Sequence, residues 1–385
     1  MPEQNLGCLR RGTQRAIGSV AALLALAAAP ALAQPSMVPA TVDGATVKLA
    51  TITHKPAGAG PFPILIFHHG STGRGTDPGI FARPYEPIFL ADWFVARGWA
   101  VVLPSRRGRG GSEGLYDEGF DIDRTRGYAC DDNLSIKGFD RALRDADAIT
   151  AAILALPFAD RARFVVGGQS RGGILSIGWS GQRPELPKGV LNFVGGWLGS
   201  GCGYSAKVNA ELFKRGAAFK SPTLWLYGDK DPFYPLSHSR GSFETFRNAG
   251  GNGSFNEYTL PDGVSGHSVV SYPQLWEATM ERYLAERGLP AKHTYRPLTD
   301  DEIKARFVGK TVDWRGGLRA DYRTDGSYEV VVESRPSSKG KYAIANGQIC
   351  VTFDDGRSRC DKINVDSRGL FMITATGAKF YGVPR

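Results

Sequence analysis

The most constraining feature of this sequence is a long stretch, residues 41–290, in which short apolar segments alternate with amphipathic ones. Residues 64–67 and 99–104 are continuous apolar runs, whereas residues 136–156 carry apolar side chains at helical spacing. Continuous apolar strands that alternate with helices are typical of a parallel sheet covered by helices on both faces. Such sheets place their binding and catalytic residues at the carboxyl ends of the strands.

The other segments of this stretch continue the alternation. Further apolar segments, which we expect to form strands, occupy residues 163–167, 190–194, 223–227 and 255–260. Amphipathic segments, which we expect to form helices, occupy residues 87–97, 171–181, 237–248 and 272–286. Together they predict an α/β domain over residues 34–290.

The last part of the chain, residues 298–385, has a different pattern. It contains three short β-like runs, at residues 328–333, 348–353 and 370–374. Gly, Asn, Asp and Ser separate these runs and favour turns. A short helix at residues 303–307 leads into them. We predict a small antiparallel all-β domain of unknown role, after a boundary near residues 291–298.

The N-terminus has the pattern of a secretory signal peptide. Three arginines lie within the first 15 residues, and the Ala/Leu-rich segment 16–32 ends in a small-residue cleavage pattern. We expect residues 1–33 to be removed and the mature protein to be exported to the periplasm or the extracellular space. An N-terminal membrane anchor is the alternative. No later apolar run is long enough to span a bilayer, so we expect no membrane insertion after signal removal.

The chain is basic, with a formal net charge of +9 at pH 7. We interpret the excess as ordinary solubility charge and expect no nucleic-acid partner, because the sequence contains no nucleic-acid-binding motif. The acidic side chains of residues 113–132 are interpreted as a solvated loop, because they lack the EF-hand spacing of a calcium site. No metal or other cofactor is expected, and the oligomeric state stays open.

Four cysteines follow the expected signal peptide. In an exported protein an even number of cysteines predicts disulfides, and four cysteines allow three pairings. We favour Cys350–Cys360, in two strands of one hairpin, and Cys130–Cys202, which would join two loops of the first domain. Zinc binding is the alternative, but no Cys-x-x-Cys pair supports it.

One motif carries chemistry directly. Residues 168–172 read Gly-Gln-Ser-Arg-Gly, follow the expected strand 163–167 and open the expected helix 171–181. Gly-x-Ser-x-Gly between a strand and a helix is typical of a nucleophile elbow, which raises the serine hydroxyl above the sheet. We therefore predict Ser170 as a nucleophile. A purely structural Gly/Ser turn is the alternative.

A serine nucleophile needs a base and an acid that orients the base. In this architecture the chain order is serine, acid, histidine. Asp231 lies just beyond the strand 223–227 and is the expected acid. Asp229 is its competitor, although Asp229 lies in the tight turn itself and is better suited to capping it.

Three histidines follow the acid. His238 falls inside the helix 237–248, and His293 lies beyond the last expected helix. His267 lies in a glycine-rich loop after the strand 255–260, where a side chain can overhang the carboxyl edge of the sheet. We therefore predict His267 as the general base.

The reaction also needs N–H donors for the oxyanion. The N–H of Arg171, directly after the serine, is the first expected donor. The N–H of Ser71, in the loop 68–73 after the first strand, is the second. His68 and His69 in this loop are neighbours on a strand and face opposite sides, so we expect no shared metal and interpret His69 as bracing the loop.

Together these motifs resemble the α/β-hydrolase superfamily, in particular its dienelactone hydrolase and prolyl-oligopeptidase-like branch. Residues 106–114 are similar to the Arg-Gly-x-Gly-x-Ser-x-Gly loop of that branch, and residues 228–232 are similar to its acid turn. The resemblance covers residues 41–289 and implies the α/β-hydrolase fold. Dienelactone hydrolases use a cysteine nucleophile, so Ser170 favours ordinary esters over lactones.

The resulting hypothesis is a secreted serine hydrolase that cleaves small-molecule carboxylic esters through an acyl-enzyme. A peptidase or amidase of the prolyl-oligopeptidase-like type is one alternative, and a non-catalytic binding protein on a hydrolase scaffold is another. Two sets of aromatic residues are candidates either for ligand contacts or for cores. They are Trp197, Tyr204 and Phe233 in the first domain, and Trp314, Tyr322 and Tyr342 in the second.

Overall fold

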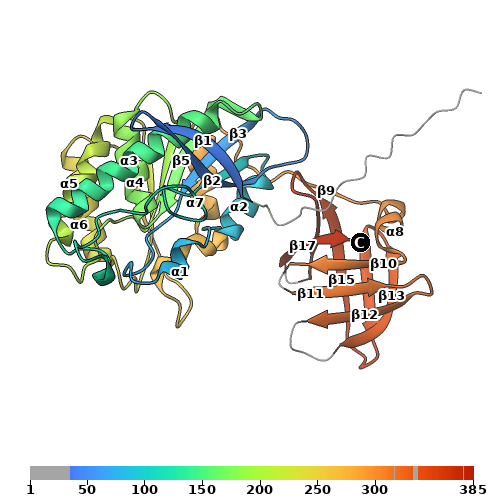
Figure 1. The fold of residues 1–385 in the computed structure, drawn as a ribbon. Helices are drawn as coiled ribbons and strands as arrows, with labels where there is room; N and C mark the ends of the chain where they lie inside the picture. Colours follow the sequence, from blue (N-terminus) through green and yellow to red (C-terminus); the bar gives the residue numbers. More distant parts are fainter. Residues whose placement is uncertain (1–34, 316, 333–336, 376) are drawn as a thin grey trace, which may run out of the picture.

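The computed structural model of this chain describes residues 35–315, 317–332, 337–375 and 377–385. The expected signal peptide, residues 1–33, lies outside the described residues. The described chain builds two sheets that share no strand, one of eight strands and one of nine. Figure 1 shows the first sheet surrounded by helices and the second sheet beside it.

The first sheet contains the strands β1 to β8. Their bounds are Ser36–Val42 (β1), Ala45–His54 (β2), Phe62–His68 (β3), Ala100–Pro104 (β4), Ala159–Gln169 (β5), Gly189–Phe193 (β6), Thr223–Gly228 (β7) and Gly253–Tyr258 (β8). The spatial order is β1-β2-β4-β3-β5-β6-β7-β8. The strands from β4 to β8 in this order run parallel, and the β1–β2 and β2–β4 pairings are antiparallel. The mostly parallel sheet predicted from the sequence is confirmed.

Helices cover this sheet. They are α1 (Pro78–Phe81), α2 (Ile88–Val95), α3 (Asp132–Leu154), α4 (Arg171–Gln182), α5 (Ser205–Lys214), α6 (Leu236–Asn248) and α7 (Pro273–Ala285). Helix α2 packs against α7, whereas α3, α4 and α5 pack against one another. Strands β4, β6 and β7 are buried along their whole length, as expected for strands that have helices on both faces.

The strands β1 and β2 and the helices α1 and α5 were not predicted. In β1 the side chains alternate between buried and exposed, and in β2 only the middle is buried, which is a weaker signal than a continuous apolar run. Helix α5 buries only one narrow face, which includes Val208, Leu212 and Phe213, and its other face is polar. Such a short amphipathic helix depends on tertiary packing more than on its own propensity.

The second sheet is a closed antiparallel barrel preceded by a short strand, β9 (Arg296–Pro297). Its strands are β10 (Lys310–Trp314), β11 (Leu318–Tyr322), β12 (Ser327–Val332), β13 (Ser338–Ala345), β14 (Gln348–Phe353), β15 (Ser358–Val365), β16 (Leu370–Ile373) and β17 (Lys379–Pro384). Each pairs with its neighbour in the chain, and β10 pairs with β17, which closes the ring. The predicted antiparallel all-β architecture is confirmed, and the predicted hairpin of Cys350 and Cys360 is formed by β14 and β15, although β9, β10, β11, β13 and β17 were not predicted.

A short helix, α8 (Asp300–Phe307), leads into the barrel. It begins with a capping box, in which Thr299 and Glu302 satisfy each other's backbone N–H groups. Phe307 of this helix is buried against Trp314 and Tyr322, so these aromatic residues of the barrel form a core. This core and the core of the first domain are separate clusters, the first ending at Ala291 and the second starting at Leu298.

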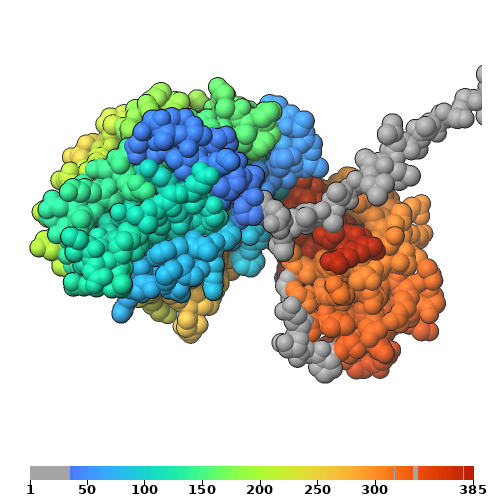
Figure 2. Space-filling model, in the orientation of Figure 1, coloured from blue at the N-terminus to red at the C-terminus, as the bar shows by residue number. Residues whose placement is uncertain are grey.

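The barrel contacts the first domain through a few polar bonds. Asp92 on α2 accepts from Arg315, at 2.6 Å, and from Arg368, at 2.8 Å. The hydroxyl of Ser367 donates to the backbone oxygen of Val95 at 2.5 Å. Figure 2 shows the barrel, in orange and red, as a separate lobe beside the first domain. None of the helices in the described part of the chain has the length and apolar character needed to cross a bilayer.

Candidate active site

Ser170 lies at a sharp turn between β5 and α4. Its backbone φ is +58°, a left-handed conformation that residues other than glycine rarely adopt. A backbone held in such a region costs about 1–3 kcal/mol, and residues of this kind cluster at functional sites. Ser170 is 5% exposed and lines a pocket of about 800 Å³. The segment therefore has the strand–turn–helix geometry of a nucleophile elbow.

Two glycines make this turn possible. A Cβ atom on Gly168 would lie 2.3 Å from the backbone carbonyl carbon of Gly172. A Cβ atom on Gly172 would lie 2.0 Å from the backbone oxygen of His68. Both neighbours are backbone atoms that cannot move aside, so neither position tolerates a side chain. The glycines on either side of the serine are required by close backbone approach.

His267 and Asp231 form a hydrogen-bonded pair. His267 Nδ1 lies 2.9 Å from Asp231 Oδ2, and the Asp231 side chain is fully buried. The other carboxylate oxygen of Asp231 accepts the N–H groups of Phe233, at 2.8 Å, and Tyr234, at 3.1 Å. Because the carboxylate accepts the hydrogen bond at Nδ1, the proton of a neutral imidazole lies on Nδ1 and Nε2 is the free acceptor.

Ser170 and His267 line the same pocket. The side chain of Gln169, the residue before the serine, donates to the backbone oxygen of His267 at 2.7 Å and thereby links the two loops. Within the described part of the chain, no hydrogen bond joins Ser170 directly to His267. Such bonds commonly shorten only when substrate binds.

The loop after β3 approaches the serine from the other side. A Cβ atom on Gly70 would lie 3.0 Å from the Cβ of Ser170, and the next residue, Ser71, also lines the pocket. His69 holds this loop, because its Nε2 accepts the N–H of Arg106 at 3.1 Å and its Nδ1 donates to the oxygen of Gly70 at 2.8 Å. Burial lowers the pKa of His69 well below its ordinary value, so the ring is neutral.

The three predicted side chains follow three strands of one sheet. Ser170 follows β5, Asp231 follows β7 and His267 follows β8, so all three lie at the carboxyl edge. This chain order of serine, acid and histidine, on a mostly parallel sheet whose first pairings are antiparallel, is specific to one architecture. The chain has the α/β-hydrolase fold.

No protein-family model matches the sequence of this chain, and no curated protein matches it. Several solved structures are similar to it. An esterase from Pyrococcus furiosus is 14% identical, covers 66% of this chain and 90% of its own, and has a TM-score of 0.44. A protein from Butyrivibrio proteoclasticus with bound ferulic acid is 14% identical; the match covers 60% of this chain and 96% of that protein, with a TM-score of 0.41. An acetyl xylan esterase from Paenibacillus sp. R4 is 18% identical; the match covers 62% of this chain and 80% of that protein, with a TM-score of 0.43.

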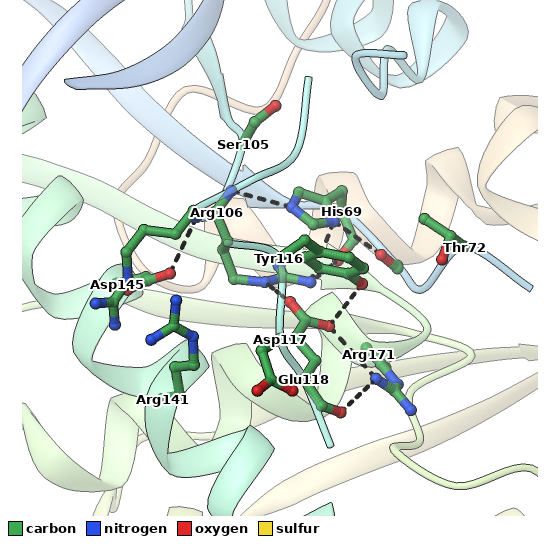
Figure 3. A network of polar contacts seen from close by, with 12 residues as sticks. His69, Thr72, Ser105, Arg106, Tyr116, Asp117, Glu118, Arg141, Asp145 and Arg171 are labelled. Carbon is green, nitrogen blue, oxygen red and sulfur yellow. Dashed lines mark hydrogen bonds and ion pairs between the residues drawn. The ribbon is translucent and has the colours of Figure 1, made fainter. Parts of the chain in front are cut away.

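A buried ionic network is centred on Glu118 (Figure 3) and includes Arg171, which lines the pocket. Glu118 forms an ion pair with Arg106 and accepts from the hydroxyl of Tyr116 at 3.0 Å. Arg171 Nη1 donates to the backbone oxygen of Glu118 at 2.8 Å and lies 3.5 Å from its carboxylate. Burial acts to raise the pKa of Glu118, but the arginine charges outweigh it and hold the pKa below its ordinary value, so Glu118 is ionised.

The same network reaches the loop after β3. The hydroxyl of Tyr116 lies 2.6 Å from that of Tyr128. The Tyr128 hydroxyl accepts the N–H of Thr72 at 3.2 Å and contacts its Oγ1 at 2.9 Å. The network therefore connects the two segments that carry the N–H groups of Ser71 and Arg171, the expected oxyanion donors.

The structure corrects our interpretation of the acidic loop. We expected the acidic side chains of residues 113–132 to be solvated, but Glu118 is 2% exposed. The charge of the arginine-rich segment 106–109 is also buried rather than serving solubility, and Arg107 pairs with the buried Asp145 at 2.6 Å. Several arginines close together in a glycine-rich segment are a signal that carboxylates could pair with them. The sequence spacing between this segment and the acidic residues that follow does not distinguish Glu118 from the others.

The residues that we considered as alternatives lie elsewhere. Asp229 accepts the N–H of Leu260 at 3.0 Å and so links the segment after β7 to the segment after β8, rather than capping its own turn as we predicted. His238 bonds to Asn209 at 2.9 Å, and His293 pairs with Asp366 of the barrel at 2.6 Å. Of the aromatic candidates in the first domain, Trp197 and Phe233 line the pocket, whereas Tyr204 is not among its lining residues.

Both disulfides in the structure are the pairs favoured by the sequence. Cys350 and Cys360 are directly opposite in the β14–β15 hairpin. Cys130 and Cys202 join the loop before α3 to the loop before α5, and both line the pocket beside Ser170. The second bond therefore fixes two segments of the pocket wall to each other.

Proposed function

We propose that this protein is an exported serine hydrolase that cleaves carboxylic esters of small molecules. The observation that carries the proposal is the His267–Asp231 pair, with its Nδ1–Oδ2 distance of 2.9 Å, at the pocket that Ser170 lines. The strained φ of +58° at Ser170 supports a functional rather than a purely structural turn. The two disulfides support export, because such bonds persist in oxidising compartments.

In the proposed mechanism, His267 Nε2 removes the proton of Ser170 as the serine oxygen attacks the ester carbonyl. Asp231 holds the imidazole in the required tautomer and stabilises the imidazolium. The N–H groups of Arg171 and Ser71 bind the oxyanion. His267 then protonates the leaving alcohol, and a water activated by the same imidazole releases the acid from the acyl-enzyme.

The composition of the pocket favours esters over peptides. A peptidase that binds the terminal amine of its substrate needs a carboxylate in the pocket, and none of the residues lining this pocket is Asp or Glu. Its charged lining residues are arginines: Arg74, Arg109, Arg126 and Arg171. A substrate with a free ammonium group would therefore be repelled.

A substrate screen tests this proposal. The mature protein, residues 34–385, is assayed with p-nitrophenyl esters of increasing acyl length and with aminoacyl p-nitroanilides, and is treated with a fluorophosphonate probe. We expect hydrolysis of the esters, little hydrolysis of the anilides and one probe label per chain. Preferential cleavage of the anilides would support the peptidase alternative. Absence of both turnover and labelling would support a non-catalytic binding protein.

Removal of the pocket disulfide is expected to weaken substrate binding. Replacing Cys130 and Cys202 with serine frees two segments of the pocket wall, so we expect KM for esters to rise more than kcat falls. The free energy of unfolding should fall by about 2–4 kcal/mol, because the bond restricts the unfolded chain. Steady-state kinetics and denaturant unfolding measure both effects.

The matched control is the replacement of Cys350 and Cys360 by serine. This bond lies in the barrel, outside the pocket, and should change KM little. An equal rise in KM for the two double variants would show that the pocket disulfide has no specific role in binding.

A further inference from the structure

Three buried arginines and one buried carboxylate lie beside the pocket. Arg106, Arg109 and Arg171 are each 5% exposed or less, and Glu118 is 2% exposed. All three arginine charges act on Glu118 and lower its pKa. Arg106 and Arg171 form ion pairs with Glu118, whereas Arg109 forms none with it, so the three buried guanidinium groups exceed the single carboxylate in charge. Figure 3 shows that Glu118 lies between Arg106 and Arg171, with which it forms ion pairs.

The other groups near the cluster do not balance this charge. Burial raises the pKa of Tyr116 well above its ordinary value, so its hydroxyl stays neutral. Asp145 is paired with Arg107, a further arginine, at 2.6 Å. Asp231 is committed to His267 and to two backbone N–H groups.

Arg109 is the member of the cluster that lacks a partner. Its Nε and Nη1 atoms are buried, and no hydrogen bond or ion pair in the described part of the chain reaches them. Its guanidinium carbon lies 5.3 Å from the centre of the Tyr116 ring. A buried charge without a partner is costly, so an unpaired guanidinium at a pocket wall indicates a ligand that brings the counter-charge.

The position of Arg109 supports this interpretation. Arg109 lines the same pocket as Ser170 and His267. Arg126, with a side chain that is 71% exposed, lies at the same pocket and forms a long ion pair with Asp121, at 3.8 Å. Arginines that line a pocket without acidic residues attract an anion and raise its local concentration.

We propose that the pocket binds ester substrates that carry a carboxylate group, and that Arg109 binds this carboxylate. The guanidinium attracts a carboxylate through its charge and can donate a hydrogen bond to it from Nη2, since Nε and Nη1 are buried. The inference rests on the proposed esterase function and specifies which esters the site prefers. Arg109 is in this view a specificity-determining residue, and Ser170, His267 and Asp231 perform the reaction on any ester that enters.

Matched ester pairs test the preference. In one pair the charge lies on the alcohol side, with 4-acetoxybenzoate compared with its neutral methyl ester. In the other it lies on the acyl side, with monophenyl adipate compared with phenyl hexanoate. We expect the wild-type protein to prefer the charged member of at least one pair by about 10- to 100-fold in kcat/KM, mainly through KM. This preference should decline as sodium chloride is added.

Replacing Arg109 with glutamine should abolish the preference, measured as the ratio of kcat/KM for the charged and the neutral member of each pair. Arg109→Lys keeps the positive charge but replaces the guanidinium by an ammonium group, so it should retain part of the preference for charged esters. Arg141→Gln is the matched control, because it removes a nearby arginine that does not line the pocket. Equal activity on charged and neutral esters in the wild type, or an unchanged preference in Arg109→Gln, would overturn the proposal.

A binding measurement separates this inference from the esterase proposal. Calorimetry of the Ser170→Ala variant with benzoate and with adipate reports anion binding without any reaction. We expect binding of at least one of them, which weakens about tenfold or more when Arg109→Gln is added. Binding that depends on Arg109 without any ester hydrolysis by the wild type would refute the esterase function alone. Ester hydrolysis without such binding or preference would refute the carboxylate site alone.

Discussion

Replacement of Ser170 by alanine is expected to lower kcat for p-nitrophenyl esters by about a millionfold, because removal of a serine nucleophile has an effect of this size in serine hydrolases. Labelling by a fluorophosphonate should disappear at the same time. The fold should persist, because alanine is smaller and Ser170 makes no hydrogen bond from its side chain that caps α4. Steady-state kinetics and probe labelling of the purified variant measure both effects.

Ser180→Ala is the control for this variant. Ser180 is a buried serine on the same helix, and its hydroxyl donates to the backbone oxygen of Ile177 at 2.8 Å, away from the pocket. Its loss should leave kcat within a few-fold of wild type. Ester turnover by Ser170→Ala at a rate close to wild type would contradict the proposed nucleophile, whatever the result for Ser180→Ala.

Replacement of Asp231 by asparagine has the second largest expected effect, a loss of about 10⁴-fold in kcat. An amide nitrogen facing Nδ1 would favour the tautomer with its proton on Nε2, and that tautomer cannot accept the serine proton. Asparagine also fails to stabilise the imidazolium of His267. KM should change little, because Asp231 lies behind the imidazole and does not line the pocket.

Asp229→Asn distinguishes this role from the nearest alternative. Asp229 accepts one backbone N–H, from Leu260, and an asparagine oxygen can accept the same bond. We therefore expect Asp229→Asn to retain most of its activity. A loss of about 10⁴-fold in Asp229→Asn together with an active Asp231→Asn would show that the orienting acid is Asp229 and not Asp231.

The parts of the fold that were predictable have strong local patterns. Strands such as β4 and β7 are continuous apolar runs because helices cover both of their faces, and a run of this kind needs no tertiary information to be recognised. Strand β13 was missed because its side chains alternate between buried and exposed, and only closure of the barrel defines which face is inside. Helix α5 was missed because its buried face is narrow.

Some residues of the candidate site could also be predicted from the sequence, and others could not. The Gly-x-Ser-x-Gly motif is visible in the sequence because other backbone atoms lie too close to positions 168 and 172 for any side chain, so both must be glycine. Asp231 and His267 could be chosen because each follows a predicted strand at the edge where such residues meet. The partner of the arginine-rich segment could not be chosen, because several carboxylates of the following loop lie at similar distances along the chain.

The sequence alone determined the α/β and all-β character of the two domains, the turn that carries Ser170 and the candidates for its base and acid. These depend on hydrophobic periodicity and on steric limits that act over a few residues. The tertiary structure alone decided that Glu118 is buried among three arginines and that Arg109 is left unpaired at the pocket wall. The physical reason is that the energy of a charge depends on its burial and on its neighbours in space, and neither is written in the local sequence.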